Sequence, residues 1–150
     1  MPIVADTNNS ANSAVDEIDF VHLHNHTHYS LLDGLQKVPS TVERAKQLGM
    51  HSLAITDHGT LSGAIEFFKA CKSSGIKPII GMEAYVAARK HTDKNTAEDR
   101  NPYHLTLLAK NMDGYKNLMK LSTTAAQEGF YYKPRIDHDL LKKQSKGLVV

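Results

Sequence analysis

Four histidines alternate along one short segment, at positions 22, 24, 26 and 28 of the sequence. In an extended strand, alternate side chains project to the same face, so these imidazoles can converge on one point. The carboxylate Asp33 follows within one loop, and His58 and Glu83 each stand near the end of a later apolar stretch. Imidazole and carboxylate groups together are typical ligands of a transition-metal ion. The residue types and their spacing therefore predict a metal site.

The composition is that of an ordinary globular chain in all respects but one. The 150 residues are 41% hydrophobic and 23% charged, which allows one domain with a real core. The net charge of +2 is too small to indicate nucleic-acid binding by itself, whereas nine histidines are an outlier. The single cysteine, Cys71, excludes an internal disulfide, and its place on an apolar helical stripe favours packing over reactivity.

The two ends of the sequence have unusual compositions. Residues 1–18 are rich in Asn, Ser, Ala and Asp and have neither a basic region nor an apolar run. They resemble neither a secretory signal nor a transit peptide, and we expect a disordered lead-in to a cytoplasmic protein with no membrane span. The final apolar run, residues 147–150, is typical of the beginning of a buried strand. Residues 19–150 are therefore expected to be the N-terminal portion of a longer domain.

Short apolar strands alternate with amphipathic helices along the chain. Strands are predicted at 20–26, 52–56, 78–87 and 103–109, and helices at 39–49, 61–74 and 112–127, with a charged loop at 89–102. This alternation predicts an α/β fold with a mostly parallel sheet, open or closed as a barrel. Functional groups of such folds gather at the C-terminal ends of strands, which places the candidate ligands together. His104, at the start of the fourth strand, joins them.

Helical spacing also predicts which side chains are buried. Leu61, Ile65 and Phe68 share one face of the second helix. The predicted core residues of the third helix are Tyr115, Leu118, Ser122 and Ala125.

Five segments of the sequence, in order, resemble one known family. They are HLHNHTHYSLLDG at 22–34, ITDHG at 55–59, IKPIIGMEAYV at 76–86, HLTLLA at 104–109 and GFYYKPRID at 129–137. Together they resemble the polymerase-and-histidinol-phosphatase (PHP) domain, over roughly residues 20–150. The similarity is greatest to the branch found at the N-terminus of the alpha subunit of bacterial DNA polymerase III, which is indicated by the run from 114 to 137.

The resemblance implies a fold and a set of metal ligands. The implied fold is α/β, a PHP-type distorted seven-stranded (β/α) barrel of which this chain carries only the N-terminal part. The barrel would hold up to three divalent ions, zinc, manganese or iron. The implied ligands, catalytic through the bound metals, are His24, His26, Asp33, His58, Glu83 and His104. Three further ligands of the family have no counterpart up to Val150, yet all six matched positions hold a competent ligand, so retained metal binding is expected.

Other residues near these motifs have two interpretations each. His22 is either outer support for the ligands or a plain core histidine, and Asp57 is a supporting or loop-capping group. Arg135 either contacts a phosphate or forms a surface ion pair. We expect His28 on a loop surface and the remaining histidines exposed to solvent. These are His51, His91 and His138.

The resemblance also implies a function. The full-length protein would be a DNA-directed DNA polymerase whose separate palm domain uses magnesium, with primer–template DNA, a sliding clamp and a proofreading subunit as partners. This domain would be a metal-dependent phosphoesterase that removes 3′-terminal nucleotides or hydrolyses pyrophosphate. One alternative is a stand-alone PHP phosphatase of the histidinol-phosphatase type, which the motifs between 103 and 137 fit poorly. Another is a metal-stabilised scaffold that docks the proofreading subunit.

Overall fold

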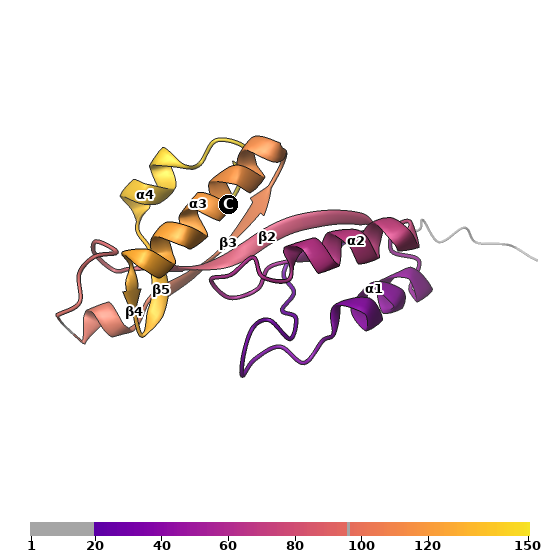
Figure 1. The fold of residues 1–150 in the computed structure, drawn as a ribbon, viewed down its shortest axis with the longest axis horizontal. Coiled ribbons are helices and arrows are strands. Elements are labelled where there is room, and N and C mark those ends of the chain that lie inside the picture. The colour runs from indigo at the N-terminus through magenta and orange to yellow at the C-terminus, as the bar shows by residue number, and fades with distance from the viewer. Residues whose placement is uncertain (1–19, 96) are drawn as a thin grey trace, which may run out of the picture.

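The computed structural model describes residues 20–95 and 97–150 and contains helices packed on one mixed sheet (Figure 1). The predicted lead-in, residues 1–18, lies outside the described residues. The helices are α1 (Val38–Gln47), α2 (Ala64–Ser74), the 3-10 helix η1 (Glu98–Arg100), α3 (Met112–Gln127) and α4 (His138–Lys143). The strands are β1 (Ser52–Ile55), β2 (Lys77–Val86), β3 (Tyr103–Ala109), β4 (Phe130–Tyr131), β5 (Lys133–Ile136) and β6 (Leu148–Val149). No helix in the described ranges is both long and apolar enough to cross a membrane.

The long strand β2 organises the sheet, because it pairs with three others. It runs parallel to β1 and to β5 but antiparallel to β3, and β3–β6 and β4–β5 are antiparallel too. The α/β class is confirmed, but the prediction of a mostly parallel sheet is wrong. A parallel return needs a crossover connection, usually an α-helix, and the described part of the segment between β2 and β3 contains only η1. The chain therefore comes back antiparallel.

The predicted strand at 20–26 is an extended segment without regular strand pairing. Two backbone amides next to it, those of Ala54 and Thr56, donate to the carbonyl oxygens of His22 and Asn25 at 3.1 and 2.9 Å. In the reverse direction the Asn25 amide donates to the hydroxyl Oγ1 of Thr56, at 2.8 Å, rather than to a backbone carbonyl. A polar side chain thus takes the place of a ladder bond, which is why the segment lies beside β1 without continuing the sheet.

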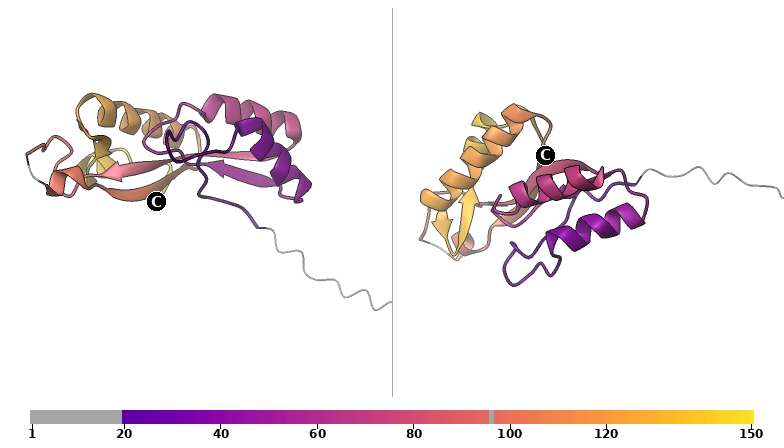
Figure 2. Two further views of the ribbon diagram at one scale, coloured as in Figure 1. Left: turned by 90° about the horizontal axis from the view of Figure 1, so that it is seen from below. Right: turned by 45° about the vertical axis from the view of Figure 1, so that its right-hand side comes forward.

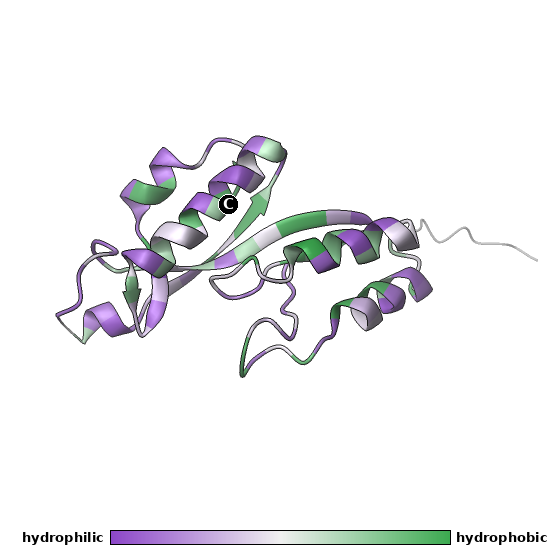
Figure 3. Cartoon of the chain, viewed as in Figure 1, coloured by the Kyte–Doolittle hydropathy of each residue, from purple (hydrophilic) through white to green (hydrophobic). Residues whose placement is uncertain are grey.

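Buried apolar side chains form two clusters. The first lies between α1, α2 and β1 and consists of Val38, Val42, Ala45, Leu53, Ile55, Phe67, Cys71 and Ile76. The second lies between β2, β3 and α3 and consists of Met82, Ala84, Val86, Leu107, Leu118, Leu121, Ala125 and Ile136. Figure 3 shows the matching hydrophobic stretches along β2, β3 and α2. In Figure 2, left, α2 and α3 cover the same side of the sheet. Because strand side chains alternate, the odd-numbered residues Glu83 and Tyr85 project to the face opposite α3.

The buried face of α2 differs from the predicted one. Ala64, Phe67 and Cys71 are buried, whereas Ile65 and Phe68 are 57% and 45% exposed. The helix is apolar on two sides, and periodicity alone does not say which side meets α1 and β1. Cys71 has the predicted packing role, because it is fully buried and burial raises the pKa of its thiol to about 11.

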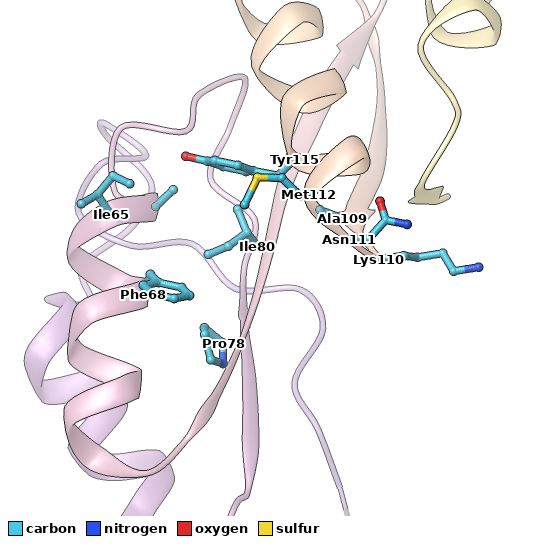
Figure 4. Close-up of a pocket in the computed structure, with 10 residues that line it drawn as sticks. Ile65, Phe68, Pro78, Ile80, Ala109, Lys110, Asn111, Met112 and Tyr115 are labelled. Atoms are coloured by element: carbon cyan, nitrogen blue, oxygen red, sulfur yellow. The ribbon is translucent and has the colours of Figure 1, made fainter.

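Ile65 and Phe68 line an apolar groove between α2, β2 and the beginning of α3 (Figure 4). The opposite walls include Ile80, Met112 and Tyr115. Tyr115 was predicted as a core residue of α3 but is half-buried in this groove. Helix α3 itself begins and ends where predicted. Its buried face contains the expected Leu118 and Ala125, but Leu121 is buried in place of the half-buried Ser122.

Candidate metal centre

The structure brings all six predicted ligands together in three overlapping groups. Within each group, one ligand atom per residue lies within 4.8 Å of the others. The groups are His24–His26–Glu83, His26–Asp33–His58 and His58–Glu83–His104. Their members come from the extended segment, the loop after it, the end of β1, the middle of β2 and the beginning of β3. Residues up to 80 positions apart in the sequence therefore converge on one place.

Glu83 is the centre of this cluster, with a side chain that is only 6% exposed. Its Oε2 atom contacts Nε2 of His24 and lies 3.0 Å from Nε2 of His26. Its Oε1 atom lies 2.6 Å from Nδ1 of His104 and 3.9 Å from Nδ1 of His58. Each carboxylate oxygen thus serves a different set of imidazoles. This is the arrangement that a carboxylate bridging two ions requires.

Asp33 and His58 form the other side of the cluster. Oδ2 of Asp33 lies 2.8 Å from Nε2 of His58, and the Asp33 side chain is 55% exposed. The rings of His26 and His58 stack with centroids 4.1 Å apart and planes 9° apart. This packing aligns the two imidazoles next to each other, so both can present ring nitrogens to a shared position.

The sheet positions these ligands through the two edges of β2. On one edge, Glu83 forms a parallel bridge with His58, and on the other edge it pairs with Thr106 of β3. His104 lies opposite Tyr85, two pairs further along. Because β3 is antiparallel, its first residues lie at the C-terminal half of β2. His104, near the beginning of β3, therefore lies close to Glu83 in the C-terminal half of β2 and to His58, which follows β1.

Asp57 holds the ligand-bearing segments in place from inside the protein, where it is buried. Its Oδ1 accepts hydrogen bonds from the Thr27 amide at 2.6 Å and the Ser30 hydroxyl at 2.8 Å, and its Oδ2 accepts from the Thr27 hydroxyl at 2.8 Å. The Ser30 hydroxyl also accepts from the His58 amide, at 3.0 Å, and lies 3.5 Å from Nδ1 of His26. Groups of this kind fix the orientation of ligands.

Tyr85 is a further part of the site, one that sequence reasoning did not single out. Its ring stacks on His58 with centroids 5.6 Å apart and meets the edge of His104 at 4.9 Å. The side chain is 6% exposed, so it forms a fixed wall behind these two ligands. The signal available in the sequence was its position two residues after Glu83 in a strand, which places both side chains on one face.

The ligands themselves modify each other's protonation. Burial by itself raises the pKa of Glu83, but hydrogen bonds with His24 and His104, and the charges of His24 and His58, outweigh it and bring the pKa below its usual value. Burial, followed by repulsion from His58, lowers the pKa of His26. Both shifts favour the forms that ligate metals, an ionised carboxylate and a neutral imidazole.

The donor set fits divalent metal ions. Nδ1 of His58 is buried and has no hydrogen-bond partner, and it faces Oε1 of Glu83 across 3.9 Å. Buried polar nitrogens are rarely left unpaired. An ion that is ligated at about 2.0–2.2 Å by both atoms would satisfy the nitrogen and span the gap. The three groups together offer imidazole nitrogens and carboxylate oxygens, which suit zinc, manganese or iron.

Two of the predicted neighbours lie elsewhere. His22 is exposed with its ring against Phe20, so it is neither a core histidine nor in contact with any of the ligands described. Arg135 is fully buried and donates to the backbone carbonyls of Gly129, Asp99, His91 and Asp93 at 2.7–3.1 Å. Both interpretations of Arg135, a phosphate contact and a surface ion pair, are therefore wrong.

The other histidines divide into exposed and half-buried residues. His28, His51 and His138 are exposed, as predicted. His91 was predicted to be exposed, but its side chain is only 16% exposed, and Nδ1 lies 2.5 Å from Oδ2 of Asp137. Arg135 draws the segment around His91 inward, and no local sequence pattern shows that contact.

Comparison with known proteins gives consistent results. Residues 22–150 match the family described as the PHP domain. The chain is 52% identical over 137 residues to the DNA polymerase III subunit alpha of Aquifex aeolicus and 54% identical over 132 residues to that of Helicobacter pylori. Each match covers 87% of this chain and 12% or 11% of the relative. The chain thus spans about one ninth of the length of these curated relatives.

Similarity also extends to a relative from Thermus aquaticus with the same name, at 47% identity over 89% of this chain and 11% of the relative. Among solved structures, one from Bifidobacterium adolescentis described as a metal-dependent phosphoesterase matches 71% of this chain and 33% of its own, at 25% identity. Its TM-score of 0.48 is below the level at which a shared fold can be inferred.

Proposed function

Because the chain belongs to the PHP domain family, we propose that its metal centre hydrolyses phosphoesters and that it is the N-terminal PHP domain of a DNA polymerase III alpha subunit. The substrate of the centre would be the 3′ end of a DNA strand, from which it removes nucleotides. The full-length protein would act as a DNA-directed DNA polymerase in the cytoplasm, with a magnesium-dependent palm domain. Its partners would be primer–template DNA, a sliding clamp and a proofreading subunit.

One observation carries the proposal: the carboxylate of Glu83 lies in a cluster with five other candidate ligands of the correct chemistry. Divalent ions held by these residues would supply Lewis acidity to a phosphoryl oxygen and to an attacking water. A cluster that only stabilised the fold would need no opening, because a structural metal site is filled by protein ligands, whereas a catalytic site keeps a position open. The side chains of His24, Asp33 and His104 are instead 55%, 55% and 48% exposed, which leaves the cluster open to a substrate.

The chain's own residues contribute position and charge. Glu83 supplies one oxygen to each of two ligand groups and carries a negative charge that compensates for the bound cations. Asp57 and Ser30 hold the loop of Asp33 against the end of β1, so that the ligands keep their geometry when substrate enters. Tyr85 excludes water from the side of His58 that faces the sheet.

The test compares ligand variants of the full-length protein. We expect His24→Ala and His58→Ala to abolish metal-dependent release of 3′-terminal nucleotides from a labelled oligonucleotide, because each removes an imidazole that contacts or faces Glu83. His28→Ala is the matched control, since His28 is an exposed histidine of the same segment and belongs to none of the three groups. Metal content and primer extension are measured on the same samples to check folding.

Equal nuclease rates in His58→Ala and the unchanged protein, both purified free of metal and reloaded, would refute the proposal. Loss of metal and of thermal stability without any nuclease activity in the unchanged protein would support the scaffold alternative. Melting with and without a chelator, beside the nuclease assay, separates these two roles. Hydrolysis of histidinol phosphate but not of DNA would favour the stand-alone phosphatase.

A further inference from the structure

We infer that Lys133 is a phosphate-binding residue of this centre, a role for which the sequence had suggested Arg135. The inference rests on the proposed function, because it assigns the group that receives the phosphate next to the metals. Arg135 is unavailable, since four of its five N–H groups bind backbone carbonyls in the interior. Lys133 stands two residues earlier in the same strand, at its exposed beginning.

The sheet brings Lys133 to the metal centre. On one edge of β2, β1 and then His58 pair with residues 77–83, and β5 follows on that edge with Arg135 opposite Tyr85. The beginning of β5 therefore lies close to Gly59, the residue that follows His58. The approach is close, because a Cβ atom on Gly59 would lie 2.8 Å from Cγ of Pro134. No L side chain fits between these two segments.

The Lys133 side chain then lies over the wall of the site. Its Nζ atom is 5.4 Å from the centroid of the Tyr85 ring, within the range of a cation–π interaction. The same ring contacts the ligands His58 and His104. Lys133 is exposed and, among the residues described, has no carboxylate partner within ion-pair distance. Its ammonium group is thus held near the cluster and is free to bind an anion.

A phosphate is the anion that this arrangement fits. The six clustered residues offer two carboxylates and four imidazoles, so a lysine at the margin of the cluster adds a cationic side chain that complements a phosphate. The lysine ammonium is a compact donor on a flexible stem, so it can adjust its position to a bound phosphate. A hydrogen bond that involves ionised partners is roughly twice as strong as a neutral one. The ammonium of Lys133 would bind a non-bridging oxygen of the phosphate that the metals hold.

The experiment measures binding of inorganic phosphate to the manganese-loaded, full-length protein, by the effect of Mn²⁺ on phosphorus-31 relaxation. We expect Lys133→Met to weaken phosphate binding about tenfold, and Lys133→Arg to restore most of it. The bound manganese per protein should not change. Lys120→Met is the matched control, because Lys120 is an exposed lysine on α3, which packs on the other face of the sheet. The phosphorus-31 relaxation caused by manganese at any other site is measured on His58→Ala and subtracted.

The outcomes separate the two proposals. Equal phosphate affinity in Lys133→Met and the unchanged protein would overturn the role of Lys133 and leave the proposed function intact. A complete absence of manganese-dependent relaxation in the unchanged protein would overturn both. A kinetic measurement on a dinucleotide phosphodiester adds a second criterion. Loss of a phosphate-binding cation should raise KM about tenfold, whereas general structural damage would lower kcat and metal content together.

Discussion

The carboxylate of Asp137 joins the loop before η1 to the beginning of α4, and its removal should loosen both. Oδ2 accepts the backbone amide of His91 at 2.9 Å and contacts Nδ1 of the same residue, and Oδ1 caps α4 by accepting the amide of Leu140 at 2.8 Å. Burial by itself raises the pKa of Asp137, but these hydrogen bonds outweigh it and lower the pKa from 3.8 to about 2. The Asp137 side chain is 8% exposed, so water screens the contacts little.

The size and sign of the effect follow from that shift. A decrease from 3.8 to about 2 is just under two pH units, which corresponds to about 2.5 kcal/mol at about 1.4 kcal/mol per unit. A carboxylate whose folded-state pKa is depressed stabilises the fold above its unfolded pKa. The contribution of Asp137 should therefore be complete above pH 4 and should disappear as the pH falls from about 4 to about 2.

The assay is amide hydrogen exchange in the full-length protein, read at the amides of His91 and Leu140. At neutral pH, Asp137→Asn should reduce their protection up to about sixtyfold, the equivalent of about 2.5 kcal/mol. Asp139→Asn is the control, since it removes an exposed carboxylate from the same helix. Unchanged protection in Asp137→Asn, or a difference between variants that is as large at pH 2.5 as at pH 7, would refute the reasoning.

Three other substitutions test the packing around the site. Asp57→Asn should weaken metal binding about 10- to 100-fold in a calorimetric titration, because it loosens the segments that carry ligands. Gly34→Ala should have a similar effect in the same titration, since its Cβ would lie 1.9 Å from the carbonyl oxygen of Thr27; affinity equal to that of the unchanged protein would contradict this close approach. Leu121→Ala should lower the free energy of opening of α3, measured by local hydrogen exchange, by about 2–5 kcal/mol. Met119 is 40% exposed, so Met119→Ala should lower it much less, and equal decreases would contradict the described core.

The six candidate metal ligands could be chosen from the sequence because they lie in short segments with recognisable patterns, and their role as ligands stays a prediction. The alternating histidines, Asp33 in the next loop, and His58 and Glu83 near apolar stretches all require only local patterns. The α/β class and the PHP family predicted from those segments are confirmed. The structure then gathers the six residues into overlapping groups, with no predicted ligand left outside.

What the sequence did not predict depends on contacts between distant segments. The direction of β3 depends on the connection from β2, which has no crossover helix in its described residues. The burial of Arg135 depends on backbone carbonyls of the same connection, which point inward and accept hydrogen bonds from its guanidinium. Helix α2 is apolar on two sides, so the choice between Phe67 and Phe68 as the core residue is made by α1 and β1. The role of Tyr85 as a wall of the site likewise appears only when strands are paired, whereas a supporting role for Asp57 was predicted from the sequence.

The position of the cluster between the two hydrophobic cores has a mechanical consequence. His24, His26 and His58 are attached to the core of α1, α2 and β1, whereas His104 belongs to β3 and the core under α3. Among the described elements, strand β2 is the one that packs into both cores, with Ile80 against the first and Met82 in the second. Ions bound across this boundary would act as a clamp that resists shear, and they would make the two halves unfold as one unit. Chelation would release the clamp, and each half would then open with its own free energy.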